Sequence, residues 1–116
     1  MALSAAHVRE KLSGLVSGMT GLRADGRFDE PNLDGTPGDY VTFDSWEWPQ
    51  GVGLYGLVKL WKQTGDKALL ATIEGWYDRR IAAGLPAMNV NTTAPLLALC
   101  EMWRMTRQPR YAKVLA

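Results

Sequence analysis

Cysteine and histidine are each present only once in this sequence of 116 residues, as Cys100 and His7. A single cysteine cannot form an internal disulfide, and without a CxxC pair or a cluster of cysteine and histidine a structural zinc site is excluded. Cys100 lies in an apolar segment with helical spacing, so we expect a buried thiol that behaves as a small hydrophobe. His7 has no evident partner to position it as a base, so we expect it in solvent rather than in a catalytic site.

Long runs of like charge and of apolar residues are missing too. The net charge is +1 and the longest cationic run is Arg79–Arg80, so nothing in the sequence attracts nucleic acid or an acidic membrane surface. No apolar stretch approaches the roughly 18 residues of a membrane span. Charged residues at 9–11 interrupt the segment where a signal peptide would be most hydrophobic. We therefore expect a cytoplasmic protein that binds neither nucleic acid nor membrane.

The apolar residues recur at three- and four-residue steps, which is the spacing of amphipathic helices. We predict helices at about 4–20, 49–64, 66–83 and 92–107, the start of a further helix at 110–116, and a long loop at 23–48 with a short extended piece at 40–43. Ser4 and Asp66 fit as N-caps, and Gly21 and Gly65 as stop signals. The length suits one domain, so the prediction is a single all-α domain over residues 1–116.

An internal repeat of 42 positions relates the helix at 49–64 to the helix at 92–107. The matching pairs are Leu54 with Leu96, Leu57 with Leu99, Trp61 with Trp103 and Thr64 with Thr106. Such a repeat is typical of stacked helical hairpins, in which one unit cannot bury its apolar face without a neighbour. We expect Trp61, Trp76 and Trp103 in the core. The second copy is incomplete, so we expect an open edge, through which the chain self-associates or pairs with the missing part of the array.

Two tryptophans, Trp46 and Trp48, stand just before the helix at 49–64. Aromatic rings on a loop match the C–H faces of sugar rings, but aromatic residues that plug the end of a helical core give the same pattern. Asp44 and Glu47 lie beside them. An acid/base pair of the glycosidase type needs two carboxyl groups at a controlled separation, whereas two solvated carboxylates on a loop are the simpler interpretation.

A second polar loop, residues 89–93, leads into the helix at 92–107. Its amides and hydroxyls, among them those of Asn89, Asn91 and Thr92, can bind the oxygens of a carboxylate or a hydroxyl-rich ligand, helped by free N–H groups at the helix start. Capping by threonine and turn formation by asparagine explain the same residues. The occurrence of both loops at helix starts favours a binding site at one end of the array.

Several of these motifs together resemble the N-terminal part of a known enzyme family. They are the run WEWPQGVGLYGL from Trp46 to Leu57, then Thr64–Gly65–Asp66, Trp76, Gly84–Leu85–Pro86, and NVNTTAP from Asn89 to Pro95. The sequence is similar, from about Val8 onward, to the unsaturated rhamnogalacturonyl hydrolases of glycoside hydrolase families 88 and 105. The resemblance implies a six-hairpin α/α barrel, of which these stacked hairpins form the incomplete N-terminal part.

The resemblance also implies an activity, which is removal of an unsaturated uronic acid from small oligosaccharides left by pectin breakdown. The family hydrates the C4–C5 double bond with an aspartate as general acid and base, and no metal or organic cofactor is implied. That aspartate lies beyond residue 116, so the catalytic residue is unknown here and the chain alone should be inactive. By resemblance, the residues that line the sugar pocket are Trp46, Trp48, Asn89, Asn91 and Thr92. Some members carry an assisting aspartate near 89–91; this sequence either departs from that pattern or places the group elsewhere.

Two alternatives stay open at this point. The chain can be a non-enzymatic binding or interaction module that keeps the hairpin architecture without the chemistry. It can also belong to another α/α-barrel carbohydrate enzyme, such as a lyase or an epimerase, because a fold does not determine a reaction.

Overall fold

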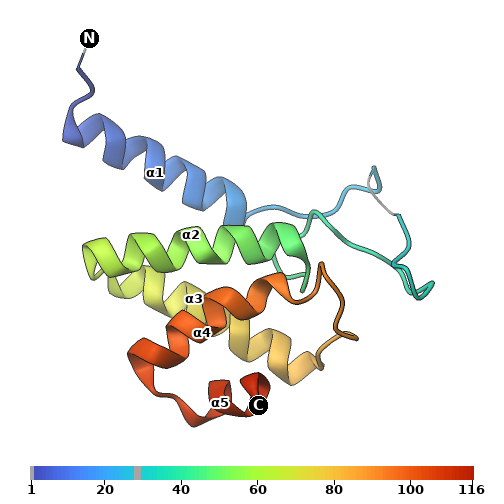
Figure 1. The fold of residues 1–116 in the computed structure, drawn as a ribbon. Coiled ribbons are helices and arrows are strands. Elements are labelled where there is room, and N and C mark those ends of the chain that lie inside the picture. Colours follow the sequence, from blue (N-terminus) through green and yellow to red (C-terminus); the bar gives the residue numbers. More distant parts are fainter. Residues whose placement is uncertain (1, 28–29) are drawn as a thin grey trace.

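The computed structural model describes residues 2–27 and 30–116, and five helices make up most of that part of the chain (Figure 1). They are α1 (Ala5–Thr20), α2 (Trp48–Thr64), α3 (Lys67–Ala83), α4 (Ala94–Thr106) and α5 (Pro109–Leu115). Each begins and ends within two residues of its predicted bounds. The described residues contain no strand. The extended piece predicted at 40–43 is a series of bends, because the Asp39 carboxylate accepts hydrogen bonds from the N–H groups of Val41 and Thr42.

The predicted helix signals act as expected. The Ser4 hydroxyl accepts from the His7 N–H and caps α1, and the Asp66 carboxylate accepts from the Ala68 N–H and caps α3. Gly21 follows the last residue of α1. Gly65 ends α2 in the left-handed conformation, with φ 66°. Local chemistry therefore sets these four helix ends, whereas Thr93, the N-cap of α4, makes no side-chain hydrogen bond to its helix.

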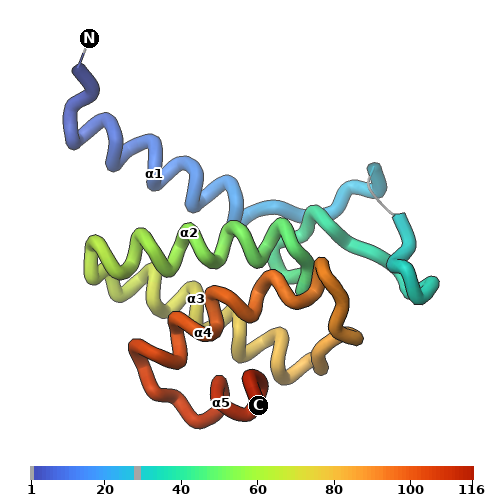
Figure 2. The backbone as a smooth tube through the Cα atoms, in the orientation of Figure 1, coloured from blue at the N-terminus to red at the C-terminus, as the bar shows by residue number. Residues whose placement is uncertain are grey.

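The sequence repeat is also a repeat in space. Gly65 and Arg107 lie 42 positions apart in the sequence. Gly65 ends α2 and Arg107 ends α4, and both adopt the left-handed conformation, at φ 66° and 54°. Their N–H groups donate to the carbonyls of Trp61 and Trp103, at 2.7 and 2.8 Å. α2 and α4 run in the same general direction and pack against each other, while α3 runs back in the opposite direction beside α2 (Figure 2). The chain is therefore a stack of helical hairpins, as the repeat predicts.

The core lies where α2, α3, α4 and α5 meet. Leu57 and Leu99, which are equivalent in the repeat, are both buried. Trp76 is fully buried, while Trp61 and Trp103 pack at the core's edge and are half-buried. Burial of apolar surface at about 25 cal/mol per Å² is the main stabilising term in such a stack.

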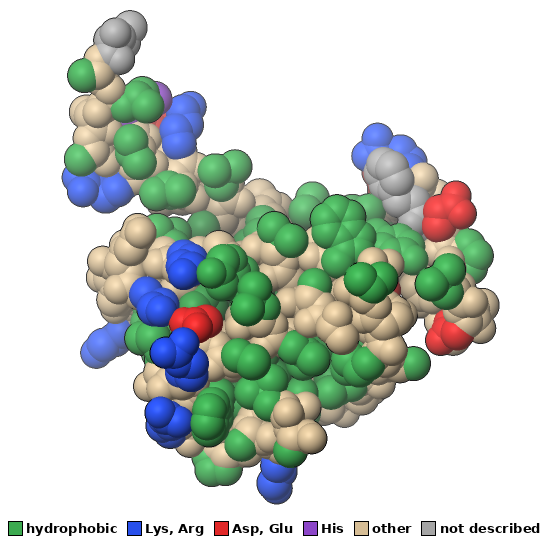
Figure 3. Space-filling model, in the orientation of Figure 1, with side chains coloured by type: hydrophobic (Ala, Val, Ile, Leu, Met, Phe, Trp, Pro, Cys, Tyr) green, Lys and Arg blue, Asp and Glu red, His purple; other side chains and the backbone are tan. Residues whose placement is uncertain are grey.

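Cys100 is exposed, which corrects the expectation of a buried thiol. α4 buries the face that carries Ala98, Leu99 and Met102, and Cys100 lies on the other side of the helix. Leu97 is also exposed on α4. Hydrophobic side chains accordingly gather over this side of the molecule in Figure 3.

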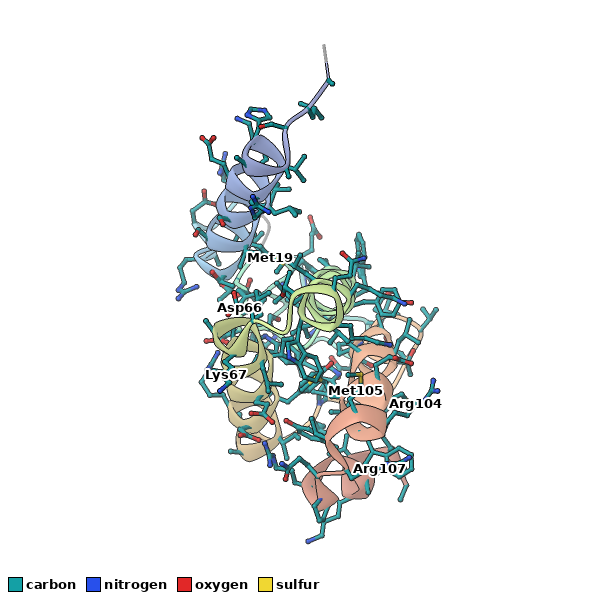
Figure 4. All side chains as sticks on the ribbon, turned by 90° about the vertical axis from the view of Figure 1, so that its left-hand side faces the viewer. Met19, Asp66, Lys67, Arg104, Met105 and Arg107 are labelled. Atoms are coloured by element: carbon teal, nitrogen blue, oxygen red, sulfur yellow. The ribbon has the colours of Figure 1, made fainter. Side chains whose placement is uncertain are left out.

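α1 contributes no buried residue and extends away from the hairpins (Figure 1). The C-terminal end of α1 attaches the helix to the hairpins, because Val16 and Met19 pack against the core there. Met19 lies at that junction in Figure 4, and its sulfur occupies the space that a side chain at Gly53 would need. None of the helices in the described ranges is long and apolar enough to cross a membrane.

The contact between α2 and α4 depends on a glycine. A Cβ at Gly51 would lie 2.7 Å from the carbonyl carbon of Ala94 and from the nitrogen of Pro95. These backbone atoms cannot move aside as a flexible side chain could. The absence of a side chain at Gly51 therefore lets the first turns of the two helices touch.

Two glycine substitutions in α2 should have opposite effects. Gly51→Ala should lower the free energy of unfolding by about 1–3 kcal/mol, because it overpacks the helix contact. Gly56→Ala should raise it by about 0.5–1 kcal/mol, because Gly56 has open space around its Cα and alanine favours the helix. Urea unfolding of both variants measures the difference. Equal effects of the two substitutions would contradict the proposed close contact.

Candidate functional site

The two polar loops meet at one end of the hairpin stack. The loop before α2 and the loop before α4 lie at the same side of the molecule, beside the N-terminal ends of both helices (Figure 1). A direct hydrogen bond joins them: the Trp46 indole N–H donates to the Thr92 carbonyl, at 2.7 Å. The structure thus brings together two segments that the sequence separates by 46 positions.

Trp46 belongs to the core. It is 6% exposed and stacks on Trp76, with ring centroids 5.3 Å apart and an interplanar angle of 25°. The expectation that Trp46 offers its face to a sugar is therefore not met in this structure, because Trp76 and the edge of Tyr77 occupy its surroundings. The core interpretation that the sequence left open holds for this tryptophan.

The neighbours of Trp46 also donate hydrogen bonds to backbone carbonyls, one in the loop before α2 and one in the first turn of α4. The Trp76 indole N–H donates to the Phe43 carbonyl at 2.6 Å, and the Tyr77 hydroxyl donates to the Pro95 carbonyl at 2.7 Å. Burial raises the pKa of Tyr77 well above its ordinary value, so this hydroxyl keeps its proton. These side chains of α3 hold the loop before α2 and the first turn of α4.

Trp48 is 50% exposed and is the first residue of α2. Proline at position 49 follows it in the first helical turn, where a missing N–H costs nothing. Trp48 is therefore the tryptophan of this pair that can meet a ligand.

Thr92 is 2% exposed and stabilises its own loop. Its hydroxyl donates to the Ala87 carbonyl and accepts from the Asn89 N–H, both at 2.8 Å. The Asn89 side-chain oxygen accepts from the N–H groups of Asn91 and Thr92. Thr92 is thus placed as a scaffold residue rather than as a ligand contact, because both of its hydrogen-bonding functions are used.

The start of α4 offers few free N–H groups. The N–H groups of Thr93, Ala94 and Leu96 already donate to loop carbonyls, and position 95 is a proline. The expected anion site at this helix end therefore lacks its donors. Among the hydrogen bonds of the described residues, the Asn89 side chain uses only its oxygen and Asn91 uses only its backbone, so the side-chain NH₂ groups of both residues remain available as donors.

Asp44 and Glu47 have different surroundings and do not share a hydrogen bond. Asp44 forms an ion pair with Arg79 at 2.7 Å, whereas Glu47 is 7% exposed. Burial raises the pKa of Glu47, and its Oε2 has no hydrogen-bond partner in the described residues. The structure thus does not place these residues as an acid/base pair. The described residues also contain no group of three or more histidine, cysteine, aspartate or glutamate side chains able to hold a metal ion.

Gln50 is a site residue that the sequence reasoning missed. It is 4% exposed, and its side-chain NH₂ donates to the carbonyls of Tyr40 and Thr42, at 3.2 and 2.9 Å. A glutamine in the first turn of a helix gives no signal by itself, because its partners lie in the preceding loop. These two hydrogen bonds attach the loop before α2 to the first turn of the helix.

The hydrogen bond that joins the loops can be tested with two tryptophan substitutions. Trp46→Phe should lower the free energy of unfolding by about 1–3 kcal/mol, because it leaves the buried Thr92 carbonyl without its donor. Trp48→Phe, at a half-exposed position, should change it by less than about 0.5 kcal/mol. Urea unfolding measures both. A Trp46→Phe variant as stable as the Trp48→Phe variant would contradict a structural role for Trp46.

The buried carboxyl group predicts a pH dependence of stability. Burial favours the protonated form of Glu47, so its pKa is higher in the folded state than in the unfolded state. Its contribution to the free energy of unfolding is therefore complete below the unfolded pKa, near 4.5, and is lost as the pH rises through the folded pKa. Glu101 is the opposite case: its hydrogen bond to Lys62 lowers its pKa, so its contribution is present above the unfolded pKa and is lost as the pH falls.

Urea unfolding over a pH series measures both effects. As the pH rises, the free energy of unfolding of Glu47→Gln should increase relative to that of the unmodified chain, and that of Glu101→Gln should decrease relative to it. If the Glu47→Gln profile ran parallel to that of the unmodified chain, Glu47 would have an ordinary pKa.

Comparison with known proteins agrees with this hairpin architecture. The chain matches the family model of Glycosyl Hydrolase Family 88 over residues 23–116, which includes both loops, and it belongs to that family. It is 25% identical over 72 residues to the unsaturated rhamnogalacturonyl hydrolase YesR of Bacillus subtilis (strain 168). That match covers 62% of this chain and 21% of YesR.

Solved structures show the same fold. A possible member of the GH105 family from Klebsiella pneumoniae superposes with a TM-score of 0.92 and 29% identity, over 99% of this chain and 30% of that one. A possible GH105 member from Salmonella enterica serovar Paratyphi A gives a TM-score of 0.89 and 31% identity, over 96% of this chain and 30% of that one. The chain thus has the helical-hairpin fold of the α/α-barrel enzymes and spans about a third of their length.

Proposed function

We propose that this chain forms part of an enzyme that removes an unsaturated uronic acid from oligosaccharides of rhamnogalacturonan. The observation that carries the proposal is the family match over residues 23–116, because that range includes both loops at the helix starts. The activity in the name of YesR supports the same substrate class. The reaction would be hydration of the C4–C5 double bond of the terminal sugar.

The exposed residues of the site suit this substrate. The half-exposed ring of Trp48 can stack on the flat face of an unsaturated sugar. The unpartnered NH₂ groups of Asn89 and Asn91 can donate to the oxygens of its carboxylate or hydroxyl groups. Trp46, Thr92 and Gln50 hold these residues in place from the buried side. In the described part of the two loops, every aspartate is already engaged with a neighbouring loop residue or, for Asp44, with Arg79. We therefore propose that this chain binds the sugar but does not turn it over alone.

A chimera tests the proposal. In it these 116 residues replace the matching part of YesR, and it should consume an unsaturated galacturonyl-rhamnose disaccharide, which is measured by loss of the ultraviolet absorbance of the double bond. Trp48→Ala in the chimera should lower kcat/KM about tenfold or more, equivalent to about 1.4 kcal/mol of binding. Leu33→Ala, an exposed position in the long loop, is the matched control and should not change it.

Two results would contradict the proposal. One is a folded chimera without this activity, and the other is equal kcat/KM for the Trp48→Ala and Leu33→Ala chimeras. A chimera that instead cleaves a polymer or interconverts a free sugar would favour the lyase or epimerase alternative.

A further inference from the structure

Four exposed cations gather at the C-terminal ends of α2 and α4, which is the end of these helices opposite to the two loops. This basic cluster consists of Lys59, Lys62, Arg104 and Arg107. Figure 3 shows lysine and arginine side chains around a single acidic one on this part of the surface. The sequence gives no such signal, because the four residues come from two helices that only the fold brings together.

Glu101 holds the basic cluster together. Its carboxylate accepts hydrogen bonds from the Lys62 ammonium group at 2.8 Å and from the Arg104 guanidinium group at 3.2 Å. The charge of Lys59 acts on the same carboxylate. The Glu101 side chain is 18% exposed and that of Arg104 is 69% exposed. One inner anion thus faces three cations, and positive charge remains in excess at the surface.

Two aromatic rings position the outer cations. The Lys59 ammonium group lies over the Tyr55 ring, 4.9 Å from its centroid, and the Arg107 guanidinium carbon lies 4.7 Å from the centroid of the Trp103 ring. Both rings pack against the core. These contacts restrict the cations before a ligand binds, which reduces the entropy lost on binding.

The number and setting of the charges suit an acidic oligosaccharide. A guanidinium group binds a carboxylate through two parallel hydrogen bonds, and Arg104 and Arg107 are exposed about one helical turn apart, on the same flank of α4 in Figure 4. A chain of uronate sugars offers one carboxylate on each ring.

Nucleic acid fits the basic cluster less well. Proteins that bind duplex DNA commonly make about 6–10 phosphate contacts, and four cations with an inner carboxylate supply fewer. Bases of a single strand stack on open aromatic faces, whereas the rings of Tyr55 and Trp103 lie between the core and a cation.

We propose that the basic cluster binds an acidic oligosaccharide of several uronate units. Arg104 and Arg107 bind its carboxylates, and Lys59 and Lys62 add long-range attraction. A rise of about 1.5 Å per residue along α2 places Lys62 about 20 Å from Trp48, so this ligand does not occupy the loops. The choice of uronates as the ligand rests on the proposed function. Such a surface holds the protein on the acidic polymer from which its substrate is released.

Titration of the ¹⁵N-labelled 116-residue chain with trigalacturonate tests the surface. The indole signal of Trp103 and the amide signals of Arg104 and Arg107 should shift at low salt, and high salt should weaken binding about tenfold or more, because it screens exposed charges. The methyl ester of trigalacturonate, which lacks the charges, should leave the three signals in place. Tetrathymidylate, which carries a similar number of charges, should bind about tenfold more weakly.

Two double variants of equal net charge separate the basic cluster from overall charge. Arg104→Gln with Arg107→Gln should weaken trigalacturonate binding about tenfold or more. Lys11→Gln with Lys67→Gln removes two exposed cations elsewhere and should bind as the unmodified chain does. Glu101→Gln should strengthen binding about threefold, because it removes the anion inside the cluster.

The proposal is overturned if trigalacturonate shifts none of the three signals or shifts only that of Trp48, or if the two double variants bind equally. Equal binding of the methyl ester or of tetrathymidylate would overturn the assignment to uronates. An inactive chimera together with binding that depends on Arg104 and Arg107 would overturn the proposed reaction and leave this surface standing. An active chimera without such binding would do the reverse.

Discussion

The hydrogen bond from the Trp46 indole to the Thr92 carbonyl is the contact on which the organisation of the site depends. It joins the entrance of α2 to the entrance of α4, inside an aromatic cluster where an unpaired carbonyl would be costly. The stacked ring of Trp76 supports Trp46. The packing of α2, α3 and α4 holds the rings of Trp46 and Trp76 in place, and it therefore determines the geometry of the site.

This arrangement divides buried from exposed residues within a short run of sequence. Trp46, Glu47 and Gln50 face inward, while Trp48 between them remains half-exposed. The change of direction occurs because the chain enters α2 at Trp48 and successive side chains then turn about the helix axis. Two tryptophans with the same local composition thus have different roles, one in the core and one at the surface.

The described part of the long loop is held by its own hydrogen bonds and by one buried side chain. Asn32 and Gly38 close the loop on itself, and Gln50 attaches it to α2. Long segments without helices or strands in a compact domain are often functional, and here Glu30, Tyr40 and Val41 of the loop line a surface hollow beside Trp48. The Glu47 carboxyl group lies buried beneath the same end of the stack and keeps an unpaired oxygen at a cost in stability.

The sequence by itself determined the helices, their ends and the hairpin repeat, because these depend on local spacing, on caps such as Ser4 and Asp66, and on a stop such as Gly65. The same patterns could not separate Trp46 from Trp48. They also misplaced Cys100, because an apolar segment does not reveal which face of its helix has a neighbour. Only the tertiary structure decided those positions and the anchoring role of Gln50, because burial and hydrogen-bond partners come from segments distant in the chain.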